Sequence, residues 1–241
     1  MPDNSRRDLD RAGAAVAGQQ VDARTTRALD FLNLFVANIQ TGFGPFIAVY
    51  LTTEGWTETA IGFALSLGTL TAMASQIPAG ALVDAARSKA RVGAFSIAAF
   101  FLCALLLAIW PVPLSVYLAE VLHGFSSCTL GPVIAAISLA IAGKGALGLR
   151  LGRNARFASI GNGVGAALMG ACGYLLPQAF VFYLTALLTL PAFAVLRPLR
   201  GIGDSSGRAG TATARRPRGR TAGTAPGRSR WRLSRSFWLR R

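Results

Sequence analysis

Two ionisable side chains, Glu120 and His123, lie one helical turn apart within a long apolar stretch of the chain. In the middle of a lipid bilayer an ionised carboxylate costs roughly 2.5 to 3.5 kcal/mol, so Glu120 must face a wet cavity, pair with a partner or carry a proton. Ser127 continues the same helical face. We therefore predict that Glu120 takes up a proton or binds a cation, with a satisfied interior carboxylate as the alternative. His123 is a further candidate for the binding site, and an interhelical hydrogen bond is the alternative.

Three uncharged amides are further candidates for contact with a substrate or ion. Asn33 and Gln40 are two helical turns apart on one predicted helix, and Asn162 lies on a later one. Such amides suit a neutral or zwitterionic ligand, although they also hold helices together for about 1 kcal/mol or less each. Asp30 lies near the start of the first of these helices and is interpreted as an interfacial or helix-start acid.

Six apolar stretches carry these side chains. Each is near or above the ~20 residues that are needed to cross about 30 Å of hydrocarbon. The stretches are residues 29–51, 58–83, 92–110, 114–142, 155–176 and 178–196. The sequence therefore predicts an all-α, polytopic membrane protein with six transmembrane helices.

The 25 Lys and Arg residues all lie in the two termini or in alternate connections between the apolar stretches, apart from Arg156, the second residue of the fifth stretch. The positive-inside rule assigns such connections to the cytoplasm. The remaining connections, at residues 52–57, 111–113 and around Pro177, contain no basic residue. We therefore predict a multi-pass protein of the cell membrane with both termini in the cytoplasm.

The composition divides the chain into three predicted segments. A cytoplasmic arm (1–28) precedes the membrane domain (29–200), and an Arg-rich tail (201–241) follows it. The tail has 11 Arg and a single acid. It cannot bury enough apolar surface to offset its ordering entropy, so disorder is predicted. Topology and contact with anionic headgroups explain much of the net charge of +15. Nucleic acid is not an expected partner.

A short internal similarity links the first and fourth stretches. Gly-Pro-Phe-Ile-Ala begins at Gly44, and Gly-Pro-Val-Ile-Ala begins at Gly131. Proline removes a backbone donor and clashes with the preceding turn, so we predict helix kinks at Gly44, Pro45, Gly131 and Pro132. The two stretches enter the membrane from opposite sides, as in two three-helix units of inverted topology. A chance match between two Gly-Pro pairs is the alternative.

The connection after the second stretch carries a pattern of glycine, acidic and basic residues. It reads Gly-Ala-Leu-Val-Asp-Ala-Ala-Arg-Ser-Lys-Ala-Arg from Gly80 to Arg91. In this position the pattern resembles that of the N-terminal half of a major facilitator superfamily transporter, whose full chains have twelve spans in two six-span halves. Gly80, Asp84 and Lys89 match the family's pattern, and two other positions depart from it.

The resemblance implies a conformational latch formed by Gly80, Asp84, Lys89 and Arg91. Gly80 would let helices approach closely, and Asp84 would pair with Lys89 or Arg91, or accept bonds from a helix N-terminus. A basic loop that only sets topology is the alternative. The family's fourth span often carries an Arg that is linked to proton coupling, but the matching position here is Glu120. The resemblance therefore does not assign the role of that Arg to Glu120.

Glycines in the fifth stretch predict a closely packed helix. Gly161 and Gly165 are one helical turn apart, which allows two backbones to touch. In the family this span packs against the opposite half. The resemblance therefore implies that the partner of this helix lies in a second six-span bundle.

The predicted function is transport of a small solute by a secondary transporter unit, as an incomplete half that does not transport alone. The alternative is a non-transporting membrane protein, either a truncated or frameshifted relic or an anchor for the basic tail. The sequence has no Gly-rich ATP-binding loop, Gly-x-Ser-x-Gly elbow or metal-ligand spacing, so we expect no enzyme activity, cofactor or metal. The expected partners are the lipid bilayer, a small solute, and the protein itself or a second six-span half.

Overall fold

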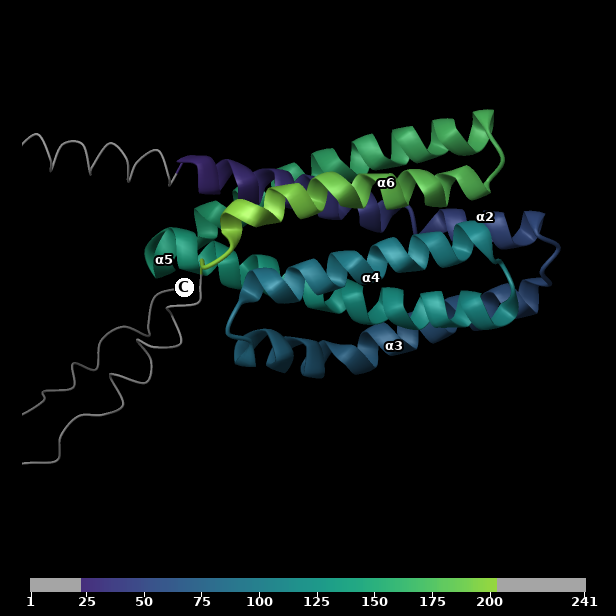
Figure 1. The fold of residues 1–241 in the computed structure, drawn as a ribbon, viewed down its shortest axis with the longest axis horizontal. Helices are drawn as coiled ribbons and strands as arrows, with labels where there is room; N and C mark the ends of the chain where they lie inside the picture. The colour runs from purple at the N-terminus through teal and green to yellow at the C-terminus, as the bar shows by residue number, and fades with distance from the viewer. Residues whose placement is uncertain (1–22, 203–241) are drawn as a thin grey trace, which may run out of the picture.

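The computed structural model describes residues 23–202, and its regular elements there are all helices (Figure 1). A first helix over residues 23–41 is followed, after a break at 42–44, by α2 (Pro45–Thr53). The later elements are α3 (Glu58–Ala85), α4 (Lys89–Ile109), α5 (Pro113–Leu175), α6 (Ala179–Leu196) and the short 3-10 turn η1 (Arg197–Leu199). Residues 1–22 of the predicted arm and residues 203–241 of the predicted tail lie outside the described residues.

Five helical stretches in this range are long and apolar enough to cross a membrane. They are Ala23–Thr53, Glu58–Ala85, Lys89–Ile109, Pro113–Leu175 and Ala179–Leu199. Large apolar side chains also remain exposed on α3, among them Phe63, Leu70 and Ile77. Such exposure is expected where lipid surrounds a helix, because lipid tails are as apolar as the side chains. The prediction of an all-α, multi-pass membrane protein is confirmed.

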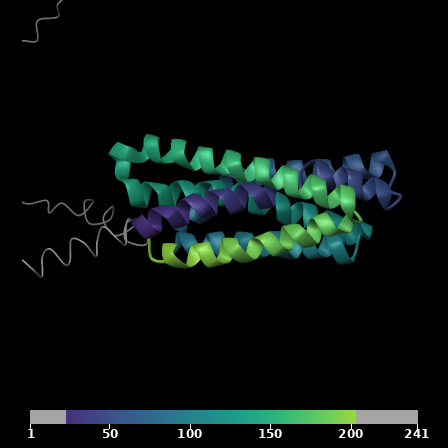
Figure 2. The same ribbon diagram turned by 90° about the horizontal axis from the view of Figure 1, so that it is seen from above.

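The helix α5 is longer than a single membrane crossing requires. Its 63 residues would extend about 95 Å at ~1.5 Å per residue, against ~30 Å of hydrocarbon. The backbone at Gly143 is not helical (φ 66°, ψ 175°), in a region that glycine adopts readily. Therefore α5 consists of two helical segments, residues 113–142 and 144–175. The second segment runs back toward the end of the bundle where α5 begins (Figure 1, Figure 2).

Two boundaries differ from the sequence expectation. The sequence predicts a connection over residues 143–154, but residues 144–154 are helical, and the first helix already begins at residue 23 rather than 29. Both differences concern polar or basic turns that extend an apolar helix beyond the hydrocarbon length. Hydropathy marks only the apolar part of a helix, so it does not detect these turns.

The two Gly-Pro pairs lie in different backbone settings. The first helix is interrupted at residues 42–44, and Pro45 occupies the first turn of α2, where a missing N–H costs nothing. In contrast, Pro132 lies inside α5, where the non-helical dihedral angles occur at Gly143. The structure thus places the interruption of α5 eleven residues beyond Pro132.

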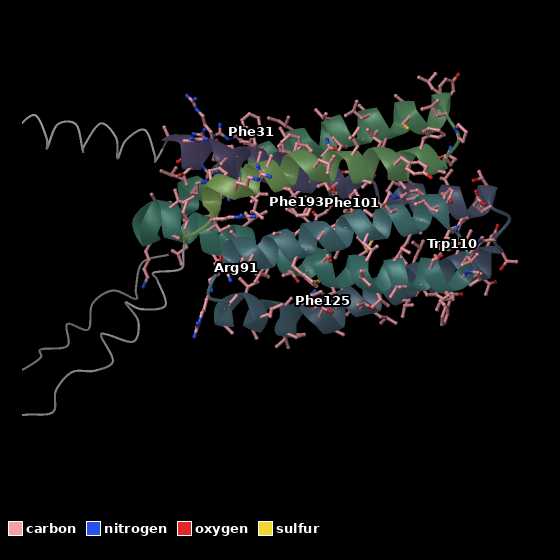
Figure 3. The ribbon with its side chains drawn as sticks, in the orientation of Figure 1. Phe31, Arg91, Phe101, Trp110, Phe125 and Phe193 are labelled. Carbon is pink, nitrogen blue, oxygen red and sulfur yellow. The ribbon has the colours of Figure 1, made fainter. Side chains whose placement is uncertain are left out.

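The connections between helices gather at two opposite ends of the bundle, which Arg91 and Trp110 mark in Figure 3. The start of the helix 23–41, the α3–α4 connection and the kink in α5 lie at the Arg91 end. The α2–α3, α4–α5 and α5–α6 connections lie at the Trp110 end. This alternation matches the two classes of connection that the basic residues distinguish in the sequence.

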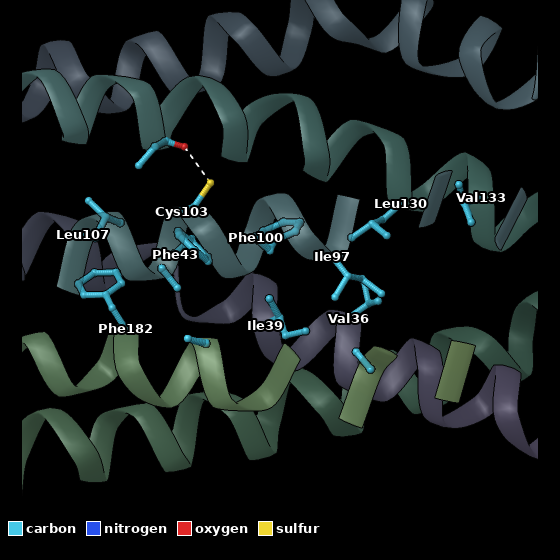
Figure 4. Close-up of a cluster of buried hydrophobic side chains, with 14 of the residues drawn as sticks. Val36, Ile39, Phe43, Ile97, Phe100, Cys103, Leu107, Leu130, Val133 and Phe182 are labelled. Atoms are coloured by element: carbon cyan, nitrogen blue, oxygen red, sulfur yellow. Dashed lines mark hydrogen bonds between the residues drawn. The ribbon is translucent and has the colours of Figure 1, made fainter. Parts of the chain in front are cut away.

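The apolar core lies where the helix 23–41, α4, α5 and α6 meet (Figure 4). The ring of Phe100 packs edge-on against Phe43, with 5.4 Å between their centroids. Phe182 lies 5.0 Å from Tyr50 by the same measure. Cys103 donates a hydrogen bond from Sγ to the carbonyl of Ala119 at 3.3 Å. The core thus fixes α4 against the first segment of α5, from which Glu120 and His123 project.

Candidate functional site

A cavity of about 410 Å³ lies between the break in the first helix, α3 and the first segment of α5. Glycines and apolar side chains form most of its wall, and a few polar groups face into it. The lining residues are Phe43, Gly44, Leu65, Gly68, Thr69, Ala72, Glu120, His123, Gly124 and Ser127. Two of the side chains predicted for the site, Glu120 and His123, therefore line one cavity.

Glu120 is held against α3 by a pair of glycines. Its side chain is 3% exposed, and its Oε1 atom has no hydrogen-bond partner. A Cβ atom at Gly68 would overlap Oε2 of Glu120, and one at Gly124 would overlap the backbone of Gly68. The carboxylate occupies space that exists only because these two positions lack side chains. Gly68 cannot be recognised as part of the site from the sequence, because nothing in the local sequence shows which helix faces it.

His123 lies between two aromatic rings. Its imidazole stacks on Phe43 with 4.7 Å between centroids and an interplanar angle of 17°, and Phe100 meets it edge-on at 5.4 Å. Among the hydrogen bonds of residues 23–202 none involves the His123 side chain, so the structure gives the imidazole aromatic contacts in place of an interhelical hydrogen bond. These contacts fix its ring at the wall of the cavity.

A second cavity of about 270 Å³ adjoins the first, since Ser127 lines both. Asn33 and Gln40 line it from the helix 23–41, and Ala158 lines it from the second segment of α5. The Asn33 amide donates to the carbonyl of Leu29 at 2.7 Å, within its own helix. The two adjoining cavities thus bring Asn33 and Gln40 of the helix 23–41 to the segment of α5 that carries Glu120, His123 and the shared Ser127.

Asn162 occupies a different place from the other predicted site residues. It lines neither of these cavities, and its Oδ1 atom accepts a hydrogen bond from the Thr41 hydroxyl at 3.1 Å. This bond joins the second segment of α5 to the end of the helix 23–41. The structure therefore shows Asn162 in a contact between helices, beside the cavities.

A charged cluster beyond the second cavity centres on Asp30, which is 2% exposed. Arg150 donates from Nη2 to Oδ1 of Asp30 at 2.6 Å, and Arg153 donates from Nη2 to Oδ2 at 2.6 Å. Arg150 is itself 6% exposed, whereas Arg153 is 45% exposed. Asp30 is therefore the shared counter-ion of two arginines, which corrects the interpretation of this residue as an interfacial or helix-start acid.

Two further polar side chains extend this cluster across the kink in α5. Arg150 donates from Nε to Oδ1 of Asn154 at 2.9 Å, and Asn154 donates from Nδ2 to the hydroxyl of Ser138 at 2.7 Å. Ser138 belongs to the first segment of α5 and Asn154 to the second. The cluster thus joins both segments to the helix 23–41. On a helix, the spacing of Arg150, Arg153 and Asn154 places the three side chains on one face.

The predicted latch residues lie at the α3–α4 connection. Lys89 donates from Nζ to the carbonyl oxygens of Val83, Asp84 and Ala86, at 2.6, 3.1 and 3.0 Å. Lysine there satisfies carbonyls that a helix end leaves unpaired. Both ion pairs between described residues involve Asp30, so Lys89 reaches the backbone of Asp84 and not its carboxylate.

The other two latch residues face outward. The side chain of Arg91 is exposed, and a Cβ atom at Gly80 would meet nothing within 4 Å. The expected close helix approach at Gly80 therefore does not occur within residues 23–202.

The glycines of the fifth stretch pack within this bundle. A Cβ atom at Gly161 would overlap the backbone of Leu34, and one at Gly165 would lie 3.1 Å from Oδ1 of Asn38. This face therefore packs against the helix 23–41, which corrects the expectation of a partner in a second bundle. In contrast, a Cβ atom at Gly163 would meet nothing within 4 Å.

Comparison with known proteins identifies the family. The sequence model described as Major Facilitator Superfamily matches residues 29–240. Two proteins from two strains of Mycobacterium tuberculosis, each called an uncharacterized MFS-type transporter, are 32% identical over 190 residues. The match covers 78% of this chain and 44% of each relative, so the chain spans less than half the length of these relatives. With the helical bundle and its cavities, the match shows that the chain belongs to the major facilitator superfamily, as the sequence pattern around Gly80 predicts.

Proposed function

We propose that residues 23–202 form one six-span bundle of a secondary transporter for a small solute. The observation that carries the proposal is the pair of adjoining cavities, which three helices line inside a bundle of this family. Glu120, His123, Asn33 and Gln40 supply the polar groups that would contact the solute or a coupling ion. Asn162 would act beside them by holding the second segment of α5 against Thr41.

Six spans follow if each segment of α5 crosses the membrane once. The helix 23–41 with α2 then forms span one, and α3 and α4 form spans two and three. The two segments of α5 form spans four and five, and α6 forms span six. We further propose that spans one to three and four to six are two units of inverted topology, supported by the Gly-Pro pairs at Gly44 and Gly131.

Transport in this family's architecture requires a second bundle, because alternating access is a rocking of two bundles about a central site. We propose that the bundle described here works with such a partner, either as part of one polypeptide or as a second copy. The latch residues Asp84, Lys89 and Arg91 would then contact the partner from the Arg91 end.

Alternating access can be tested with a cysteine at Ser127, the residue that lines both cavities. In a background without the three native cysteines, Ser127→Cys should react with an impermeant maleimide from either side of membrane vesicles. We expect this two-sided labelling when the part of the mycobacterial relative outside the match is produced together with the full chain. Labelling from the same single side with and without that partner would contradict the proposal, because a transporter's central site must open to both sides.

The orientation of the bundle can be tested in the same cysteine-free background. Residues at the Trp110 end, Thr53→Cys and Val112→Cys, should react with an impermeant reagent that is added to intact cells. Ser88→Cys and Gly145→Cys, at the Arg91 end, should react only after the membrane is opened, because basic residues are retained in the cytoplasm. Labelling of Ser88→Cys in intact cells would reverse the proposed topology.

A further inference from the structure

We propose that the cavity around Glu120 binds a monovalent organic cation with apolar substituents. The proposal rests on the transport function above and names the class of solute. Glu120 would serve as the counter-ion, and the wall around it would receive the apolar groups.

The charges around the cavity favour a single positive charge. The residues that line the two adjoining cavities include one carboxylate, Glu120, and no Lys or Arg. Both ion pairs between described residues belong to Asp30, and Oε1 of Glu120 is buried without a hydrogen-bond partner. A buried carboxylate without a partner is costly, and a cation beside it would remove that cost.

The chemistry of the wall favours an organic cation over a metal ion. Calcium takes six to eight oxygen ligands and magnesium about six. Beyond Glu120, the side-chain oxygens that line the larger cavity are the hydroxyls of Thr69 and Ser127. No group of three or more His, Cys, Asp or Glu side chains within residues 23–202 could hold a metal. In contrast, Phe43, Leu65 and Ala72 offer apolar contact.

The size of the cavity and the position of the carboxylate agree with this ligand class. About 410 Å³ falls in the range of roughly 300 to 1,000 Å³ that small-molecule sites occupy. Glu120 is packed against Gly68, so its carboxylate is fixed at the wall. A ligand could therefore pair with Glu120 without a large rearrangement of α3.

The test uses two probes of the same shape and opposite charge, tetraphenylphosphonium and tetraphenylborate. Each is titrated into the purified full chain in detergent, and bound probe is measured by equilibrium dialysis. We expect saturable binding of the phosphonium cation that Glu120→Gln weakens by at least tenfold. The matched control Glu58→Gln, which changes an exposed carboxylate at the start of α3, should leave binding unchanged. The borate anion should bind Glu120→Gln at least as tightly as wild type, because the substitution removes a negative charge from the cavity.

A second measurement on a variant that keeps Glu120 separates loss of binding from loss of folding. Thr69→Cys places a thiol in the cavity wall, and the phosphonium cation should slow its reaction with maleimide whereas the borate anion should not. Equal phosphonium binding by wild type and Glu120→Gln, or equal thiol protection by both probes, would overturn the inference. Two-sided labelling of Ser127→Cys would still support transport in that case, so failure of the ligand class is distinguishable from failure of the proposed function.

Discussion

Replacing Asp30 with Asn is expected to destabilise the folded bundle by about 3 to 5 kcal/mol, the range for removing one partner of a buried ion pair. Asp30 is the carboxylate that Arg150 and Arg153 share, and Arg150 is 6% exposed. Without Asp30, the guanidinium of Arg150 would remain buried with its charge uncompensated. The asparagine would keep an oxygen that accepts a hydrogen bond, but that oxygen carries no charge to compensate the guanidinium, whose Nη1 atom already has no hydrogen-bond partner.

The measurement is the loss of helical circular dichroism during titration of the purified protein with a denaturing detergent. Asp84→Asn is the matched control, because Asp84 is an exposed aspartate at the end of α3 and should shift stability by less than about 0.5 kcal/mol. Adding Arg150→Gln to Asp30→Asn should recover part of the loss, since the buried charge is then removed as well. Equal stability of Asp30→Asn and Asp84→Asn would show that the cluster contributes little to folding.

The same cluster has a consequence for motion. Through Asn154 and Ser138 it joins the two segments of α5, and through Asp30 it joins both to the first helix. These bonds lie at the Arg91 end of the bundle, close in sequence to the kink at Gly143. In the transport cycle that we propose, the three helical segments that carry most of the cavity residues should therefore move together, and the angle at Gly143 should stay unchanged.

Hydropathy predicted the helices well because a bilayer allows few alternatives. Backbone groups in hydrocarbon must be satisfied within the segment, so a long apolar stretch is almost always a helix. The prediction failed over residues 144–154, where the helix continues through Lys144, Arg150, Arg153 and Asn154. There the polar side chains are paired by tertiary contacts, with Asp30 from 120 residues earlier, and a single sequence gives no sign of such a partner.

Helical faces predicted part of the site. Glu120 and His123, and likewise Asn33 and Gln40, share cavities because each pair lies on one side of one helix. The link between the pairs depends on how the first helix packs against α5, which helical spacing does not reveal. For the same reason the sequence did not show that Gly68 holds Glu120, or that Asn162 bonds to Thr41.

The second large effect is expected at Gly161, where α5 packs closely against the helix 23–41. Gly161→Ala should destabilise the bundle by about 1 to 3 kcal/mol, the usual cost of overpacking. The new methyl group would overlap the backbone of Leu34. A helical backbone cannot relieve this overlap by changing rotamer, as a long side chain can. The loss should occur although alanine favours a helix over glycine by about 1 kcal/mol.

Gly163→Ala is the matched control on the same helix, because a Cβ atom there meets nothing within 4 Å. This variant should be as stable as wild type or slightly more stable, so the two glycine variants should shift detergent unfolding in opposite directions. If Gly161→Ala also left stability unchanged, the close contact with Leu34 would be wrong, and the second segment of α5 would have to lie farther from the first helix. The Thr41–Asn162 hydrogen bond crosses the same interface, so its length would then increase and the wall of the second cavity at Ala158 would open.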